Sequence, residues 1–252
     1  MSFDIDLPIR YFDTAVLAAA FPARTARLQA LVPEPLRVVE LWPGRAPLGI
    51  MCFDYRETTV GPYGEVAVCW PVVRSRRRPP PLLPLVIDGR WPEFGWWVHH
   101  LPVTTEIANY AGRTLWGYPK FVADIAFSWR DAQRVCTLAE HGEPILRLAV
   151  DTRLPARPQR FDVCTYTVLD GELLRTRIAV DAAGIRSRRG RAQLELGPHP
   201  IGREIAALGV DAGRPVEVRW YPTWRAVLPE AERRWPLARL DAPKAARAPE
   251  AA

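Results

Sequence analysis

Residues 112–120 read Gly-Arg-Thr-Leu-Trp-Gly-Tyr-Pro-Lys, and the residue that ends this stretch is of a type that is rare in the chain. Among 34 basic residues, only Lys120 and Lys244 are lysines. Arginine keeps its proton under ordinary conditions, whereas a buried lysine can lose its proton and attack a carbonyl carbon. Glycine and proline give the stretch an unusual backbone, and aromatic residues flank the amine. The stretch therefore predicts a reactive Lys120. The alternative is a surface remnant in a sequence where arginine has replaced lysine almost everywhere.

The surrounding sequence is rich in strand patterns. Eleven segments alternate apolar with polar or small residues at a period of two, as strands with one buried face do. Parallel strands need a crossover helix between them, and little helix separates these segments. We predict a mainly β (α+β) fold in which an antiparallel sheet forms a sandwich or closes into a barrel with a few short helices. The predicted strands are 36–41, 47–57, 65–73, 94–101, 121–130, 134–140, 145–151, 160–169, 173–181, 191–196 and 216–221.

The rest of the chain is predicted to form three helices, loops and a tail. The helices are expected at 23–31, at 105–111 with Thr104 as N-cap, and at 201–208, ending before Gly209. Successive prolines in 79–84 predict a stiff loop, and the sequence leaves open whether residues 74–90 form a lid. We predict a single domain over 1–237. Residues 238–252 lack apolar periodicity and are expected to be disordered.

Composition indicates an ordinary globular protein. Of the 252 residues, 48% are hydrophobic and 25% are charged. The acidic N-terminal residues do not resemble a secretory signal, so we expect a cytoplasmic protein. The longest apolar stretches, such as 15–21, fall far short of the roughly 20 residues that span a bilayer, so no membrane association is expected. The four cysteines are far apart and lack zinc-site spacing, which predicts reduced core residues and no metal site.

The net charge of +6 raises the possibility of a nucleic-acid partner. Two arginine clusters, at 74–78 and 186–191, add to it. The first runs into a proline loop and the second follows a turn signal, which is typical of solvated loops. No nucleic-acid-binding motif accompanies them. Nucleic-acid binding is therefore an unlikely, minority hypothesis.

The residues that follow Lys120 have the alternation of a strand. If Lys120 begins the strand that follows, it shares a face with the even-numbered residues 122–128, which are mostly small or polar. This lighter face leaves room for a ligand, or it is simply solvent, and the pattern does not separate the two. A second segment, Val-Gly-Pro-Tyr-Gly-Glu at 60–65, places a carboxylate at the start of an apolar strand. Glu65 is a candidate proton carrier, although an acid beside a Gly-Pro turn is more often a turn or cap residue.

Three pieces of the sequence together resemble a known family. Val-Pro-Glu-Pro-Leu at 32–36, Gly-Pro-Tyr-Gly-Glu at 61–65 and the stretch 112–120 have the order and spacing of the acetoacetate decarboxylase superfamily. The similarity extends from about residue 10 to residue 229. It implies a mostly β fold with a cone-like barrel around the site, commonly in a homo-oligomer. It also implies that Lys120 matches the family's Schiff-base lysine and Glu65 its acid/base glutamate. This family is an established example of a lysine activated by apolar surroundings or a neighbouring cation.

Two departures separate the chain from the decarboxylases. The decarboxylases follow their reactive lysine with a second one, where this chain has Phe121. They also carry an upstream arginine for the substrate carboxylate; the matching position falls near Thr14, and Arg10 is the nearest basic residue. Both differences argue against acetoacetate as the substrate. Divergent members of the superfamily use the same lysine for aldol condensation, dehydration or cyclisation of 2-oxo acids, and this sequence resembles them more.

Other side chains are candidates for substrate binding. Without a second cation, Lys120 would depend on burial among aromatic residues, which include Trp96 or Trp97. Arg113, which is close to Lys120 in sequence, is a candidate either to bind the substrate carboxylate through paired hydrogen bonds or to hold the loop in place. The adjacent His99 and His100 should point to opposite faces of a strand, so at most one reaches the cavity. The predicted substrate-binding residues are Arg113, Trp116, Tyr118, Tyr63, His100 and Phe121.

The sequence therefore favours a Schiff-base-forming lyase that acts on a small 2-oxo or 3-oxo acid, by decarboxylation or by aldol or dehydration chemistry. Lys120 and Glu65 are its predicted catalytic residues. No cofactor or metal is predicted. The alternative is a non-catalytic β-barrel that binds a small hydrophobic ligand.

Overall fold

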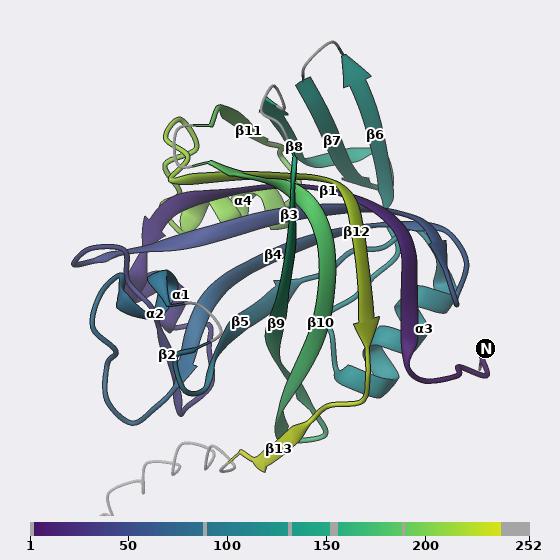
Figure 1. Ribbon diagram of the computed structural model, residues 1–252. Helices are drawn as coiled ribbons and strands as arrows, with labels where there is room; N and C mark the ends of the chain where they lie inside the picture. The colour runs from purple at the N-terminus through teal and green to yellow at the C-terminus, as the bar shows by residue number, and fades with distance from the viewer. Residues whose placement is uncertain (1–2, 88–89, 131–132, 152–155, 188–189, 238–252) are drawn as a thin grey trace, which may run out of the picture.

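The fold is a seven-stranded barrel with a second, smaller sheet packed against it (Figure 1). The computed structural model describes residues 3–87, 90–130, 133–151, 156–187 and 190–237. The expected tail and part of the second arginine cluster lie outside the described residues. The prediction of a mainly β fold with a barrel and few helices is confirmed. In order around the barrel, the strands are β12 (Glu217–Leu228), β1 (Ile9–Arg24), β3 (Arg45–Thr58), β4 (Tyr63–Arg74), β5 (Phe94–His100), β9 (Arg157–Leu169) and β10 (Glu172–Ser187).

The barrel closes through pairing of β10 with β12. Two short strands pair with barrel strands and add to the same sheet. Strand β2 (Leu36–Val38) pairs with β4, and β13 (Arg233–Pro236) pairs with β10. The predicted antiparallel arrangement holds except at one place, because β5 and β9 pair in parallel. The second sheet stands above the barrel in Figure 1 and is a separate antiparallel unit. Its strands, in order, are β11 (Ala192–Leu196), β8 (Glu143–Asp151), β7 (Gln133–Glu140) and β6 (Asp124–Arg130).

The helices are short and lie outside the barrel. Three of them match predictions, with ends shifted by several residues in places, whereas α2 falls at the end of the proline loop. The predicted N-cap, Thr104, is wrong by one residue, because Thr105 occupies that position and the Thr104 hydroxyl accepts from the N–H of Gly64. Within the described residues, no helix is long and apolar enough to cross a membrane. The helices are α1 (Thr25–Gln29), α2 (Leu83–Val86), α3 (Glu106–Trp116) and α4 (Pro200–Ala207).

Strand β4 shows how the two layers share one wall. Its side chains are buried on both faces, apart from the last residue. Val66, Val68 and Trp70 belong to the main core, together with Leu146 and Leu148 of the small sheet. The residues between them point the other way, toward the barrel interior, because side chains alternate along a strand. The outer face of β4 therefore builds the core, and its inner face is left to form a site.

Candidate active site

Lys120 and Glu65 meet inside the barrel. The Nζ atom of Lys120 lies 2.6 Å from Oε2 of Glu65, although 55 residues separate them in sequence. Lys120 is only 8% exposed and Glu65 only 6%. Glu65 is on the inner face of β4, two residues into the strand, and Lys120 follows α3. A hydrogen-bonded ion pair this deep is uncommon, because each charge loses its hydration when buried.

The end of α3 directs Lys120 toward this carboxylate. Gly117 ends the helix in the left-handed conformation, with φ of 63°, and its N–H donates to the carbonyl of Arg113 at 3.2 Å. Any Cβ at Gly117 would lie 2.2 Å from the carbonyl oxygen of Val168, so glycine is required here. The chain then turns back along the helix through Tyr118 and Pro119. Lys120 is thus held in a turn and does not begin the next strand.

This turn changes the predicted environment of the lysine. Strand β6 begins at Asp124, four residues after Lys120. The even-numbered residues 122–128, which were predicted to share a face with Lys120, differ from it in exposure to solvent. Asp124, Ala126 and Ser128 are exposed to solvent, whereas Lys120 is buried. The interpretation that they form one face was wrong, because the backbone changes direction before the strand starts.

Gly112 makes room for the stem of Lys120. A Cβ on Gly112 would lie 2.4 Å from both Cδ and Cε of the lysine. Glycine in a helix interior costs about 1 kcal/mol relative to alanine, yet here it lets the aliphatic stem lie directly on α3. The glycine that opens the stretch 112–120 and the lysine that ends it are therefore in contact. This contact explains why both occur at this spacing.

A group of tyrosines surrounds the carboxylate. The hydroxyl of Tyr55 donates to Oε1 of Glu65 at 3.3 Å, so each carboxylate oxygen has one partner. The hydroxyls of Tyr11 and Tyr63 lie 3.3 Å apart, and the rings of both pack against Tyr55. Tyr11 and Tyr55 carried no signal in the sequence, because aromatic residues in strands are usually core residues.

The tyrosines are strongly biased toward their neutral form. Burial raises the pKa of Tyr55 well above its ordinary value, and the nearby Glu65 raises it further. Burial likewise raises the pKa of Tyr63, with added contributions from Tyr11 and Glu65. These phenols therefore act as hydrogen-bond donors or acceptors at neutral pH and not as charged groups.

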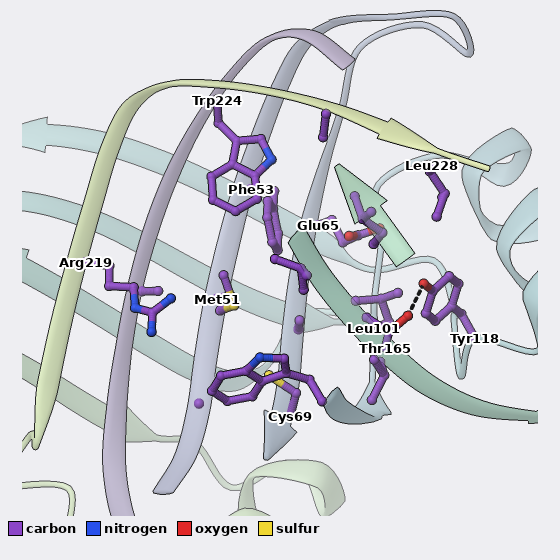
Figure 2. Close-up of a pocket in the computed structure, with 18 of the residues that line it drawn as sticks. Met51, Phe53, Glu65, Cys69, Leu101, Tyr118, Thr165, Arg219, Trp224 and Leu228 are labelled. Atoms are coloured by element: carbon purple, nitrogen blue, oxygen red, sulfur yellow. Dashed lines mark hydrogen bonds between the residues drawn. The ribbon is translucent and has the colours of Figure 1, made fainter. Parts of the chain in front are cut away.

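The pair opens into a cavity of about 130 Å³ inside the barrel (Figure 2). The hydroxyls of Tyr118 and Thr165 are 2.8 Å apart at one side of it. This volume is below the range of roughly 300–1,000 Å³ that is usual for drug-sized ligands. The cavity suits a small molecule with an apolar part. Its apolar lining includes Met51, Phe53, Trp96, Leu101, Trp224 and Leu228.

A second ion pair lines the same cavity and was not predicted. Arg219 and Glu217, two residues apart on β12, point into it and contact each other through Nε and Oε1. In Figure 2, Arg219 stands on the opposite side of Met51 and Phe53 from Glu65. The only available signal was that two charges share one face of a strand, which is equally typical of a solvent-exposed face.

The other aromatic candidates divide between the cavity and its surroundings. Tyr118 lines the cavity, and its ring centre lies 5.9 Å from the lysine Nζ. The ring of Tyr63 is 5.6 Å from the same atom. Trp116 is fully buried behind them, and its indole N–H donates to the carbonyl of Pro229 at 2.8 Å. The amine therefore lies among aromatic rings. Trp96 lines the cavity, whereas Trp97 packs against the main core.

Arg113 and Phe121 lie away from the cavity. Arg113 is exposed on α3, and Phe121 packs against the core between the barrel and the small sheet. Thr14, at the position of the decarboxylase arginine, is fully buried but is not among the residues lining the cavity. Arg10 is exposed and lies at a shallow surface depression instead. Of the described residues lining the cavity, Lys120 and Arg219 are the cations.

His99 and His100 are both directed at one carboxylate, which the sequence did not predict. In the pairing of β4 with β5, Cys69 opposes Val98 and the preceding Val68 opposes His100, so β5 has an extra residue at His99. Such a β-bulge interrupts the alternation of side chains. The expectation of opposite faces was therefore wrong. Neither histidine is among the residues lining the cavity.

The described residues of the segment 74–90 lie away from the cavity. None of the described residues in this segment lines the cavity. Arg74 packs its guanidinium over the ring of Trp235, 4.2 Å from the centre, and Leu85 packs against the small core around Phe94. Arg76, Arg77 and Arg78 are exposed, as expected of a solvated loop.

Solved structures share this architecture. The crystal structure of acetoacetate decarboxylase from Legionella pneumophila subsp. pneumophila is 16% identical in sequence, with a TM-score of 0.62 over 92% of this chain and 91% of that chain. The enduracididine biosynthesis enzyme MppR, complexed with pyruvate, is 11% identical, with a TM-score of 0.62 over 94% and 93% of the two chains. An acetoacetate decarboxylase-like enzyme from Sphingomonas wittichii RW1 is 18% identical, with a TM-score of 0.58 over 93% and 95%. At these identities the similarity shows a common fold.

Sequence comparison identifies the family. No curated protein matches the chain. The family model described as acetoacetate decarboxylase (ADC) matches residues 4–223, which is most of the chain. That range contains the whole of the stretch 112–120 and the Glu65 turn. The chain therefore belongs to the acetoacetate decarboxylase family.

Proposed function

We propose that this protein is a Schiff-base-forming lyase that acts on a small 2-oxo or 3-oxo acid, with Lys120 as nucleophile and Glu65 as proton carrier. The observation that carries the proposal is the 2.6 Å contact between the two side chains at the wall of an apolar cavity. An amine needs a nearby base to take up its proton and a dry site to favour the neutral form. Glu65 lies in position to accept that proton, and the buried aromatic residues around the amine limit its contact with water.

The reaction begins with the amine. The neutral Nζ of Lys120 adds to the carbonyl carbon of the substrate, and loss of water with uptake of a proton leaves a protonated imine. With a 3-oxo acid, the bond to the carboxylate then breaks, carbon dioxide leaves, and the electron pair moves to the imine nitrogen to give an enamine. The enamine carbon takes a proton from Glu65, and water hydrolyses the resulting imine to return the amine.

A 2-oxo acid follows a different branch from the same imine. Glu65 removes a proton from the carbon next to the imine carbon, and the resulting enamine attacks the carbonyl carbon of an aldehyde. The aldehyde oxygen takes the proton from Glu65, and water hydrolyses the imine to release the product and return the amine. The crystal structures of related enzymes include both a decarboxylase and MppR with pyruvate. Phe121, in place of the second lysine, leaves burial as the way to favour the neutral amine and makes a 2-oxo acid the stronger candidate.

The same residues argue against a protein that only binds a hydrophobic ligand. A buried ion pair contributes little net stability and can often be replaced by apolar residues without loss. An apolar ligand makes no use of an amine, a carboxylate and a phenol that converge at the wall of its cavity. The small cavity volume also fits an oxo acid better than a larger apolar molecule.

Arg219 is the second cation of the cavity and is suited to a substrate carboxylate. Its planar guanidinium can form paired hydrogen bonds to a carboxylate, which a lysine ammonium cannot do. Leu228, which lines the cavity beside Lys120, is nine residues further along β12 than Arg219. An oxo acid attached to Lys120 would need a chain long enough to pass Met51 and Phe53 before a far carboxylate meets Arg219. We infer that a carboxylate held at Arg219 belongs to an oxo acid with a longer chain.

Reductive trapping tests the proposal directly. Borohydride added with pyruvate or acetoacetate should reduce the imine and attach the mass of the substrate to the peptide that carries Lys120. Lys244, the other lysine of the chain, reports any non-specific labelling within the same sample. The Lys120→Arg variant keeps the positive charge but should give no adduct. A folded wild-type protein that forms no adduct on Lys120 with either acid, or with longer oxo acids, would overturn the proposal.

A further inference from the structure

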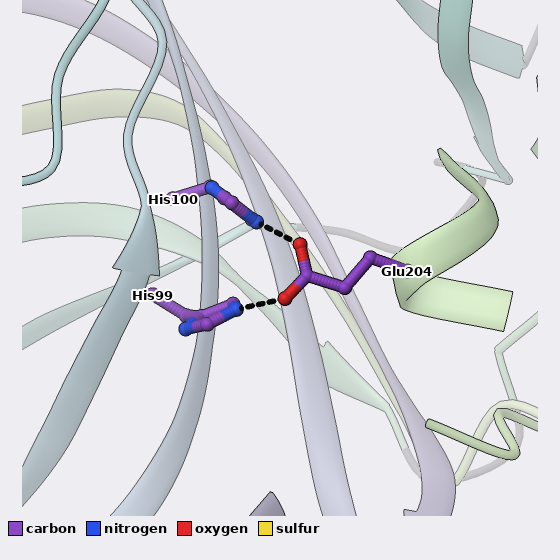
Figure 3. A group of neighbouring side chains, drawn as sticks. All are labelled: His99, His100 and Glu204. Atoms are coloured by element: carbon purple, nitrogen blue, oxygen red, sulfur yellow. Dashed lines mark hydrogen bonds and ion pairs between the residues drawn. The ribbon is translucent and has the colours of Figure 1, made fainter. Parts of the chain in front are cut away.

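A cluster outside the cavity has the composition of a metal site. The Nε2 atom of His99 lies 2.8 Å from Oε1 of Glu204, and Nε2 of His100 lies 2.9 Å from Oε2 of the same carboxylate. All the potential ligand atoms lie within 4.8 Å of one another. Figure 3 shows both imidazoles directed from β5 at the single carboxylate from α4. Among the described residues, no other group of three His, Cys, Asp or Glu side chains comes this close.

We propose that His99, His100 and Glu204 bind a divalent transition-metal ion, with Zn²⁺ as the leading candidate. Two imidazole nitrogens and one carboxylate oxygen are a known zinc ligand set, with metal–ligand distances of roughly 2.0–2.2 Å. Ligands around such an ion lie about 3 Å apart, which is close to the nitrogen–oxygen distances in this cluster. In each neutral imidazole, moving the N–H proton from Nε2 to Nδ1 exposes the Nε2 lone pair to the ion. Three protein ligands leave a fourth position for water.

The β-bulge on β5 is the feature that makes this arrangement possible. In a regular strand, neighbouring side chains point to opposite faces, and only one of two adjacent histidines could reach Glu204. The extra residue at His99 turns both rings to the same side, and their centres lie 4.4 Å apart. Bulges are structural features that redirect side chains, often near functional sites. A hydrogen-bonded clamp would need only one histidine, whereas a metal site needs both.

The cluster is accessible to an ion from solvent. The side chains of His99 and His100 are 15% and 19% exposed, and that of Glu204 is 38% exposed. Glu204 belongs to α4, which contacts β8 and β11 of the small sheet. The two histidines belong to the barrel, where the neighbouring Val98 and Leu101 line the cavity. A bound ion would therefore connect the barrel wall to the layer that packs on it, without entering the cavity.

The test uses the full chain without a polyhistidine tag, after removal of metal with a chelator. Co²⁺ should bind with one ion per chain and produce the visible absorption bands of a tetrahedral nitrogen–oxygen site. Zn²⁺ should displace Co²⁺, abolish the bands and raise the melting temperature. The His100→Asn and Glu204→Gln variants should each lose more than about 100-fold in Co²⁺ affinity, because even residues that only support a ligand change affinity 10- to 100-fold.

His141→Asn provides the matched control. His141 is an exposed histidine at the turn between β7 and β8, with a positive φ of 51° that asparagine tolerates. This variant should bind Co²⁺ as the wild type does. Absence of the bands in the wild type, with no change in melting temperature on adding Zn²⁺, would overturn the proposal. Bands of equal strength in all the variants would overturn it as well, because the ion would then bind elsewhere. The circular dichroism spectrum of each variant separates loss of ligands from loss of fold.

Discussion

The barrel carries two clusters centred on a carboxylate, and they differ in their donors and their exposure. Glu65 accepts hydrogen bonds from an amine and a phenol and is 6% exposed inside the cavity. Glu204 accepts from two imidazoles at the outer side of β5, and its side chain is 38% exposed. Burial with an amine favours covalent chemistry, whereas imidazoles near solvent favour binding of an ion. The position of a carboxylate in the layers of the fold thus determines what it is suited to do.

In the cluster of His99, His100 and Glu204, burial and the neighbouring groups shift the pKa values in opposite directions. Burial lowers the pKa of His100, the neighbouring His99 lowers it further, and the carboxylate of Glu204 acts in the opposite direction. Partial burial would raise the pKa of Glu204, but the hydrogen bonds and charges of the two histidines leave it below its ordinary value. The outer cluster is thereby biased toward an ionised carboxylate and, at His100, toward the neutral imidazole.

The largest effect is expected from neutralising the inner carboxylate. Glu65→Gln should lower turnover by about 100-fold or more, because proton transfer by a positioned group contributes roughly 10²–10⁴-fold. The borohydride adduct on Lys120 should still form, but more slowly, since the nucleophile remains and its proton acceptor is lost. Steady-state kinetics and trapping on the same preparation separate the two effects. Glu195→Gln, at an exposed ion pair on the small sheet, is the control for loss of a carboxylate. Unchanged turnover in Glu65→Gln would show that the inner carboxylate has no catalytic role and does not differ in this respect from Glu204.

A smaller effect is expected from adding one methyl group beneath the lysine. Gly112→Ala places a Cβ where the Lys120 stem now lies, and the flexible stem must shift. A displacement of about 1 Å at a reacting group can cost on the order of 100-fold in rate. The melting temperature should change little, because alanine favours the helix and the stem can move. Thr114→Ala, at an exposed position of α3, should leave both quantities near wild type. Full activity in Gly112→Ala would show that the position of the amine is not critical.

Arg219→Gln should have an effect that depends on the substrate. We expect a loss of about tenfold in kcat/KM for oxo acids with a terminal carboxylate on a longer chain, the value of one charged hydrogen bond. Pyruvate and acetoacetate should be affected much less, since they do not reach from Lys120 to Arg219. A series of acids of increasing length measures this difference. Equal losses of kcat/KM for short and long acids would show that Arg219 does not bind the terminal carboxylate of the substrate.

The smallest effect concerns alkaline pH. The raised pKa of Tyr55 means that the unfolded chain releases this proton near pH 10, before the folded chain does. The contribution of Tyr55 to the free energy of unfolding is therefore fully present below about pH 10 and decreases as the pH rises above it. Urea unfolding at neutral pH and above pH 10 should show this fall. Tyr55→Phe, which cannot ionise, should show a shallower fall. An equal slope in both proteins would mean that other groups control the alkaline loss.

The pattern of residues predicted most of the barrel strands, including β4, but not β1. Leu17 and Phe21 pack into the main core while Val16 packs with the inner aromatic group, so both faces of β1 are covered. Residues 15–21 are apolar without alternation, so this part of β1 has no period of two to detect. The local pattern could not reveal that this segment lies between β3 and β12.

The residues of the candidate site could be predicted where the residue type is unusual in this chain. They could not be predicted where the fold determines the direction of the side chain. Lys120 stood out because lysine is rare in this chain, whereas the contact of Gly112 with its stem appears only in the structure. Arg219 did not stand out among the many arginines, since nothing local distinguishes an inward from an outward charge. The joint direction of His99 and His100 depends on a bulge, which is a property of the pairing with β4 and is invisible within β5 alone.

The position of β1 between β3 and β12 has a consequence for synthesis of the chain. Residues 9–20 pair with residues 217–228, so one edge of β1 stays unpaired until residues 217–228 have left the ribosome. Such distant pairings are slow to form and leave apolar strands open to aggregation in the meantime. The nascent protein thus carries an unprotected β edge until its last long strand arrives, and a chain cut short before β12 would keep that edge permanently.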